Sequence, residues 1–205
     1  MSNDKIDIKS MNLAELTEFV AGIGEKAFRA KQLYQWLHVK QVYAFSDMTN
    51  LSKAFREKLD EVSYVTNLKQ EQVQISKIDG TRKYLFLLED GNVIESVLMR
   101  YKHGNSVCIS SQVGCRMGCR FCASTLDGLV RGLKPSEMID QIYKIGQDIG
   151  ERISNVVVMG TGEPMDNYDN LLQFITLLTD ENGLNISQRN LTVSTCGIVP
   201  RMRQL

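Results

Sequence analysis

The sequence predicts an α/β protein made of a small N-terminal helical domain (residues 1–62), an antiparallel β linker (63–100) and a βα-repeat core (101–205). In the first segment, apolar residues recur every three or four positions, as on the buried face of a helix. In the second, apolar and polar residues alternate, as in half-buried strands. In the third, apolar strands alternate with helical segments, which is typical of a parallel sheet.

The N-terminal segment is expected to contain three helices, one before residue 22, one over 27–39 and one containing 51–59. The second helix should place Phe28 on its apolar side, with Tyr34 and Trp36 in the core. The alternative for this module is a basic outer face that contacts RNA phosphates.

The linker is expected to form a meander of three strands, near residues 73–76, 83–88 and 93–99. Asp-Gly pairs at 79–80 and 90–91 supply the turns. Glu95 lies within the third strand, where an outward polar side chain is the simpler interpretation. If it points inward instead, burial would raise its pKa and make it a candidate proton acceptor.

The core begins with a strand over 105–110 that carries Cys108 and leads into a loop rich in cysteine. A helix starting at Pro135, an apolar strand at 155–159, a second helix and a strand at 191–195 follow. Ligands bind at the carboxyl ends of the strands in such sheets. We therefore expect the cysteine loop, the turn at 160–164 and the segment 194–197 to meet at one rim.

The cysteine loop holds Cys115, Cys119 and Cys122 in C-x3-C-x2-C spacing. Three thiolates on a four-iron cluster would leave one iron open for chemistry. Two alternatives remain: structural zinc with Cys108 or His103 as fourth ligand, and a disulfide within the loop. A disulfide is less expected. The charged first ten residues do not resemble a signal peptide, so we expect the protein in the reducing cytoplasm, where structural disulfides are rare.

Composition limits the possible partners. The chain is 43% hydrophobic, enough for a packed core, and its net charge is zero. No apolar run approaches the ~18 residues of a membrane span. The segment 100–134 carries a cluster of cations against one acid, Asp127. This basic zone would suit a polyanion, or it is a chance clustering on a solvated surface. Its cations are Arg100, Lys102, Arg116, Arg120, Arg131 and Lys134.

Three motifs together resemble the RlmN/Cfr family of radical S-adenosylmethionine (SAM) RNA methyltransferases. They are QVGCRMGCRFC at 112–122, MGTGEP at 159–164 and VSTCG at 193–197. The sequence FRAKQL at 28–33 is similar to that family's accessory RNA-binding domain. The pattern is closer to the RlmN type than to the Cfr type.

The resemblance implies that the core is the first half of a partial (β/α)6 radical SAM barrel. It implies roles for eight residues: Cys115, Cys119 and Cys122 hold a [4Fe-4S] cluster, Gly162, Glu163 and Ser194 contact SAM, Cys108 forms a transient disulfide, and Glu95 accepts a proton. Cys196 has no implied role and is expected to be a small buried hydrophobe.

The implied reaction is methylation of C2 of adenosine in large-subunit rRNA and, next to the anticodon, in certain tRNAs. It proceeds through a methyl-cysteine that no residue of this chain matches. That mismatch, and a last strand left as an open edge, predict a missing C-terminal part and a fragment inactive alone. The implied partners are these RNAs and a flavodoxin-like electron donor, for a cytoplasmic monomer without membrane contact. The alternatives are a radical SAM enzyme with a non-RNA substrate and a zinc-binding interaction module.

Overall fold

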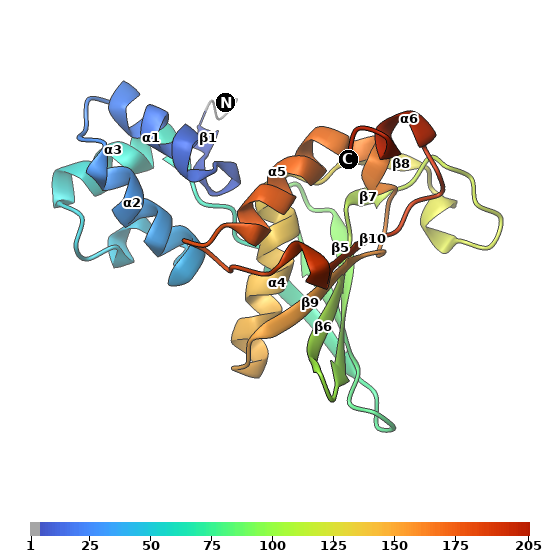
Figure 1. Cartoon of the computed structure of the whole chain (residues 1–205). Helices are drawn as coiled ribbons and strands as arrows, with labels where there is room; N and C mark the ends of the chain where they lie inside the picture. Colours follow the sequence, from blue (N-terminus) through green and yellow to red (C-terminus); the bar gives the residue numbers. More distant parts are fainter. Residues whose placement is uncertain (1–4) are drawn as a thin grey trace.

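The computed structural model describes residues 5–205 (Figure 1). The N-terminal module contains α1 (Leu13–Gly22), α2 (Phe28–Tyr34), which continues as a π-helical turn over Gln35–Val39, and α3 (Lys53–Val62). Asn12 caps α1 in a reciprocal capping box with Glu15, and the Ser52 hydroxyl caps α3. These side chains fix where the helices begin, because they satisfy amides that have no partner within the helix.

A short parallel pair closes the N-terminal module. Strand β1 (Ile6–Asp7) lies beside β2 (Ser63–Tyr64), so the segment before α1 meets the segment after α3. Of the charged first ten residues, 1–4 lie outside the described residues, whereas Ile8 and Lys9 are fully buried.

One six-stranded mixed sheet forms the centre of the core, in the order β10-β9-β6-β5-β4-β3. Its strands are β3 (Lys69–Ile75), β4 (Arg82–Leu87), β5 (Val93–Tyr101), β6 (Gly104–Ile109), β9 (Ile153–Val158) and β10 (Leu191–Val193). The first three form an antiparallel meander that continues into β6, whereas β6, β9 and β10 are parallel. The carboxyl ends of the three parallel strands therefore lie at one edge.

Helices α4 (Pro135–Ile149) and α5 (Tyr168–Thr179) pack against one another on one face of this sheet (Figure 1). The Ser96 hydroxyl on β5 donates to Gln141 Oε1 on α4 at 2.7 Å, which identifies the helix-covered face. Val107 and Ile109 of β6 are fully buried on the same side. Strand side chains alternate between faces, so Glu95 and Cys108 point to the opposite face. The short helix α6 (Val199–Met202) follows β10.

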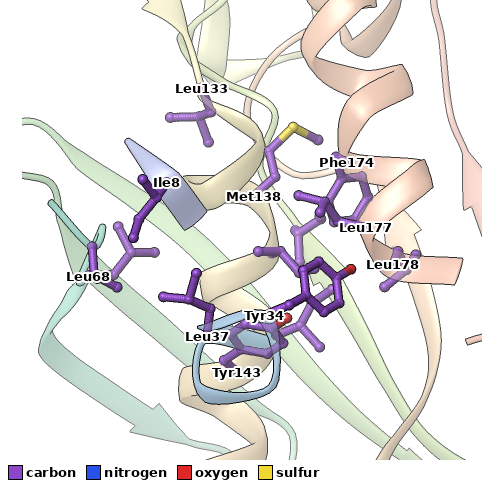
Figure 2. Close-up of a cluster of buried hydrophobic side chains, with 14 of the residues drawn as sticks. Ile8, Tyr34, Leu37, Leu68, Leu133, Met138, Tyr143, Phe174, Leu177 and Leu178 are labelled. Carbon is purple, nitrogen blue, oxygen red and sulfur yellow. The ribbon is translucent and has the colours of Figure 1, made fainter. Parts of the chain in front are cut away.

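A single hydrophobic cluster joins the N-terminal module to the core. Figure 2 shows Tyr34 and Leu37 beside Tyr143 of α4, with Phe174 and Leu177 of α5 close by. Beside it, Lys9 and Asp140 form an ion pair between side chains that have no exposed surface. The packing surface of α4 is therefore shared between the sheet and the N-terminal helices.

The α/β class is confirmed, whereas several local expectations are not. Phe28 was expected on a buried side, but 53% of its surface is exposed. Tyr34 and Trp36 are buried as expected. The division at residues 62 and 100 stays a prediction, and the structure places the meander and the parallel strands in the same sheet. Within residues 5–205, no helix combines the length and the apolar character needed to cross a membrane.

Candidate functional site

The loops after β7, β9 and β10 line one cavity of about 190 Å³ at the carboxyl edge of the parallel strands. Six residues singled out from the sequence are among those that line it: Cys115, Cys119, Cys122, Gly162, Glu163 and Ser194. The expectation that three separate segments meet at one rim is thus met by the structure. Met159, Thr195 and Cys196 also line the cavity, although no role was assigned to them from the sequence.

The cysteine loop is held at its base by a hairpin that the sequence did not predict. Strands β7 (Gln112–Gly114) and β8 (Leu129–Gly132) pair antiparallel on either side of the loop. Gly114 has a φ of +72°, and a Cβ there would lie 2.0 Å from the Gly128 carbonyl oxygen. Only glycine permits this approach. The Cys115 amide then donates to the same carbonyl at 2.9 Å, which fixes where the loop begins.

Asp166 connects the cysteine loop to the turn after β9. Its carboxylate accepts from Arg116 Nε at 2.9 Å and Nη2 at 2.5 Å, and from Gln112 Nε2 at 3.0 Å. The hydrogen bond from Arg116 is the main cause of the lowered pKa of Asp166. This link between Asp166 and Arg116 was not predicted from the sequence, because the two residues are 50 positions apart.

Glycines shape the turn after β9. Gly162 has a φ of +108°, and a Cβ there would lie 2.5 Å from the Cβ of Gln112. A Cβ on Gly160 would lie 2.7 Å from the Ser110 hydroxyl oxygen. The turn consequently lies directly against the segment that leads into the cysteine loop.

Glu163 is a buried carboxylate with 3% of its surface exposed. Its Oε1 accepts from the Met165 amide at 2.9 Å, and its Oε2 accepts from the Cys196 amide at 2.7 Å. Its own amide donates to Gln112 Oε1 at 2.8 Å. An ionised carboxylate offers about four acceptor sites. Two amides occupy part of this capacity, so Glu163 can still accept from an ammonium group in the cavity.

Ser194 follows β10, and its amide donates to the Val158 carbonyl oxygen of β9 at 3.1 Å. This bond extends the parallel pairing of β9 and β10 by one residue and brings Ser194 to the cavity.

Cys108 and Glu95 lie outside the residues that line this cavity, on the sheet face opposite α4. In the sheet, Cys108 of β6 lies opposite Val97 of β5 and Val157 of β9. The residue is half-buried, and burial raises the pKa of its thiol. Glu95 is exposed and forms an ion pair with Lys83 at 2.6 Å. Glu95 therefore lacks the buried environment that would raise its pKa and favour a role as proton acceptor. That role stays a prediction.

The cavity gathers the three thiols of the C-x3-C-x2-C loop, which the sequence predicts to hold an iron–sulfur cluster. All five cysteines are free thiols. Within residues 5–205, no group of three or more His, Cys, Asp or Glu side chains converges on a point where a single metal ion would bind. A four-iron cluster takes one thiolate per iron, so its cysteines need not converge in this way. His103 precedes the six-residue β6, about 20 Å of strand away from the cysteine loop that follows it, and is not placed to complete a zinc site.

Ion pairs neutralise much of the basic zone expected over residues 100–134. Arg100 pairs with Glu151, Arg116 with Asp166, and Arg131 with both Asp90 and Glu137. The zone is therefore a weaker attractant for a polyanion than its composition suggested.

The parallel strands β6, β9 and β10 carry at their carboxyl edge a three-cysteine loop that faces a glycine-rich turn and a buried carboxylate, and this arrangement is typical of a radical SAM core. Comparison with family models agrees: the radical SAM superfamily matches residues 109–205, and the ribosomal RNA large subunit methyltransferase N-terminal domain matches residues 6–65. The chain belongs to the RlmN family of radical SAM proteins. Membership of this family implies a [4Fe-4S] cluster and SAM.

The chain is 68% identical over 199 residues to the "Probable dual-specificity RNA methyltransferase RlmN" of Lachnospira eligens, and 64% identical over 205 residues to the protein of that name from Lachnoclostridium phytofermentans. These matches cover 97% and 98% of the chain but 57% of each relative. A crystal structure of a radical SAM methyltransferase from Sphaerobacter thermophilus superimposes with a TM-score of 0.88 at 36% identity. That match covers 97% of this chain and 59% of the other. The chain thus spans a little over half the length of these relatives.

Proposed function

We propose that this chain belongs to an enzyme that methylates C2 of adenosine in large-subunit rRNA and, next to the anticodon, in certain tRNAs. One observation carries the proposal: Cys115, Cys119 and Cys122 line the same cavity as Glu163 and the glycine-rich turn beside it. This combination suits a cofactor rather than a structural ion. The names of the relatives, which describe dual-specificity RNA methyltransferases, supply the substrate class.

In this proposal Cys115, Cys119 and Cys122 hold the [4Fe-4S] cluster. When bound, the cluster supplies the electron that cleaves SAM to a 5′-deoxyadenosyl radical. Glu163 accepts hydrogen bonds from the ammonium group of SAM with the acceptor capacity that the Met165 and Cys196 amides leave free. The cavity is smaller than the ~300–1,000 Å³ that encloses a drug-sized ligand, so SAM projects beyond it.

Gly162 and Ser194 position SAM from two different loops. Gly162 has no Cβ, which allows the turn that lines the cavity to lie directly against Gln112. Ser194 presents its hydroxyl beside the cavity from the end of β10. The two residues lie in the loops that follow the neighbouring parallel strands β9 and β10, and the hydrogen bond from the Ser194 amide to the Val158 carbonyl oxygen ties the second loop to β9.

Cys108 and Glu95 act later, in releasing the methylated product. Both belong to the face of the sheet opposite α4, and Cys108 is paired with Val97, two residues along β5 from Glu95. The raised pKa keeps Cys108 a thiol until a base removes its proton. Its thiolate then attacks the sulfur of the methyl-carrying cysteine, which no residue of this chain matches, and a transient disulfide forms as the bond between that sulfur and the transferred carbon breaks. Glu95, after leaving Lys83, accepts the proton that C2 of the adenine loses.

The partners in this proposal are rRNA, tRNA and a flavodoxin-like electron donor, and the enzyme works as a cytoplasmic monomer. The segment 6–65 provides the first RNA contacts. Exposed cations of this segment include Lys26 and Lys31, which suits contacts with phosphates more than the ion-paired zone at 100–134 does.

The test uses protein reconstituted anaerobically with iron and sulfide, then supplied with SAM, dithionite and transcripts of rRNA or tRNA. Mass spectrometry measures 5′-deoxyadenosine and 2-methyladenosine, and the methylation arm uses the longest reading frame that contains this chain. We expect both products from the unchanged protein and neither from Cys119→Ala. A colourless, zinc-loaded protein, or 5′-deoxyadenosine that does not depend on Cys119, contradicts the proposal. Cleavage of SAM with no methylation of any adenosine points to a substrate other than RNA.

A further inference from the structure

Four of the five cysteines in the chain line the same cavity. Three of them belong to the C-x3-C-x2-C loop, and the fourth, Cys196, reaches the cavity from the loop after β10. Cys108 is not among the lining residues. The expectation that Cys196 is a buried hydrophobe is wrong, because the residue is exposed.

The backbone around Cys196 is held in place from two sides. Its amide donates to the buried Oε2 of Glu163 at 2.7 Å. The chain turns at the next residue, Gly197, which has a φ of +102° and donates its amide to Thr195 Oγ1 at 3.1 Å. The main chain at Cys196 is consequently fixed by these hydrogen bonds, and the residue lines the cavity.

A thiol at this position has a specific chemical use. Three thiolates on a four-iron cluster leave one iron without a protein ligand, and protein clusters ordinarily take four. We propose that, when SAM is absent, the thiolate of Cys196 binds the iron that SAM otherwise occupies. This proposal rests on the cluster and SAM assignments of the proposed function and adds a protein ligand to them.

The exchange involves ligands and protons but no electrons. The Cys196 thiol releases its proton to water as the sulfur–iron bond forms. When SAM binds that iron through its carboxylate and amino groups, its ammonium group releases one proton, the sulfur–iron bond breaks and the Cys196 thiolate takes up a proton. The amino group keeps N–H bonds that can donate to Glu163. Cys196 therefore shields the cluster until SAM arrives, and SAM must compete with it.

Competition predicts a measurable change in SAM affinity. The apparent dissociation constant is the intrinsic one divided by the fraction of protein whose iron is open. If Cys196 closes the iron in about two thirds of the SAM-free protein, Cys196→Ala should bind SAM about threefold more tightly.

The experiment compares reduced, reconstituted wild type, Cys196→Ala and Cys196→Ser. Electron paramagnetic resonance is recorded with and without SAM, and SAM affinity is measured by titration of the spectral change. Cys108→Ala is the matched control, since it removes a thiol that does not line the cavity. We expect Cys196→Ala, but not Cys108→Ala, to alter the SAM-free spectrum, and all proteins to converge on one spectrum with saturating SAM. Cys196→Ser, which replaces the thiolate by a harder oxygen ligand, should give a third SAM-free spectrum or match Cys196→Ala.

Loss of iron to a chelator provides a second readout. Cys196→Ala should lose iron faster than wild type without SAM and at the same rate with saturating SAM. Identical SAM-free spectra, equal SAM affinities and equal rates of iron loss overturn the proposal for Cys196 and leave the proposed function intact. A wild type that assembles no cluster overturns the proposed function itself.

Discussion

The buried carboxylate of Glu163 accepts a hydrogen bond from the backbone amide of Cys196, with 2.7 Å between Oε2 and the nitrogen. The two residues are 33 positions apart and lie in the loops after β9 and β10. Because Oε1 holds the Met165 amide at the same time, one side chain sets the position of two of the three loops around the cavity. Glu163 therefore has a structural role in addition to its proposed contact with SAM.

Replacing Glu163 with Gln should destabilise the protein even without SAM. The new amide group can accept at only one position, so either the Met165 or the Cys196 amide loses its acceptor. A buried donor left without a partner costs about 1–3 kcal/mol. Urea unfolding of the variant measures this, with Glu61→Gln on an exposed position of α3 as the control. Equal stabilities of the two variants would argue against the structural role.

Lys9 and Asp140 should be strongly coupled, because both side chains are completely buried. Lys9 also donates to the Thr66 carbonyl oxygen at 3.0 Å, and Asp140 accepts from the Leu68 amide at 2.8 Å. Lys9→Met leaves the carboxylate buried without its cation, which costs about 3–5 kcal/mol. The double variant with Asp140→Asn should lose much less than the sum of the two single losses. Additive losses in urea unfolding would contradict a direct interaction.

Gly162→Ala should be more harmful than Gly91→Ala. Both glycines have a positive φ, but a Cβ on Gly91 meets nothing within 4 Å, whereas one on Gly162 would lie 2.5 Å from the Cβ of Gln112. Gly91→Ala therefore reports the conformational cost alone, about 1–2 kcal/mol. Crowding should add about 1–3 kcal/mol for Gly162→Ala and weaken SAM binding by displacing the turn. Thermal unfolding and SAM titration of the two variants provide the comparison.

Acid should destabilise the protein through His38. This ring is buried, its Nδ1 lies 2.8 Å from the Tyr143 hydroxyl, and burial is the main cause that lowers its pKa to about 3. A histidine in the unfolded chain has a pKa near 6.5. Between pH 6.5 and pH 3 the unfolded chain therefore binds a proton at His38, whereas the folded protein does not. The contribution of His38 to the free energy of unfolding is therefore complete above pH 6.5 and is lost as the pH falls towards 3.

From pH 7 to pH 5, the free energy of unfolding of wild type should fall by about 2 kcal/mol more than that of His38→Gln. Urea unfolding at the two pH values measures the shift. His103→Gln controls for the loss of a histidine at an exposed site. A difference that stays constant between the two pH values would show that His38 is protonated in the folded protein as readily as in the unfolded chain.

Local patterns in the sequence were sufficient for most elements. Apolar periodicity predicted α1, α3, α4 and α5 near their observed positions. Each of these helices buries one face, so apolar residues recur along the sequence with the period of the helix. The same reasoning failed at Phe28, which lies on the apolar side of a helix but keeps 53% of its surface exposed. The hairpin of β7 and β8 was missed because each strand is only three or four residues long, too short for a periodic signal.

The sequence by itself determined the βα order, the three-cysteine loop and the gathering of three motifs at one rim. These follow from residue spacing and from the rule that parallel strands end at a common edge. The tertiary structure alone decided the rest: the ion pairs that neutralise the basic zone, the link between Asp166 and Arg116, the exposed position of Glu95, and the meeting of Cys196 with the three loop cysteines. Each of these depends on which distant side chains come within a few ångströms of each other, and neither periodicity nor spacing along the chain carries that information.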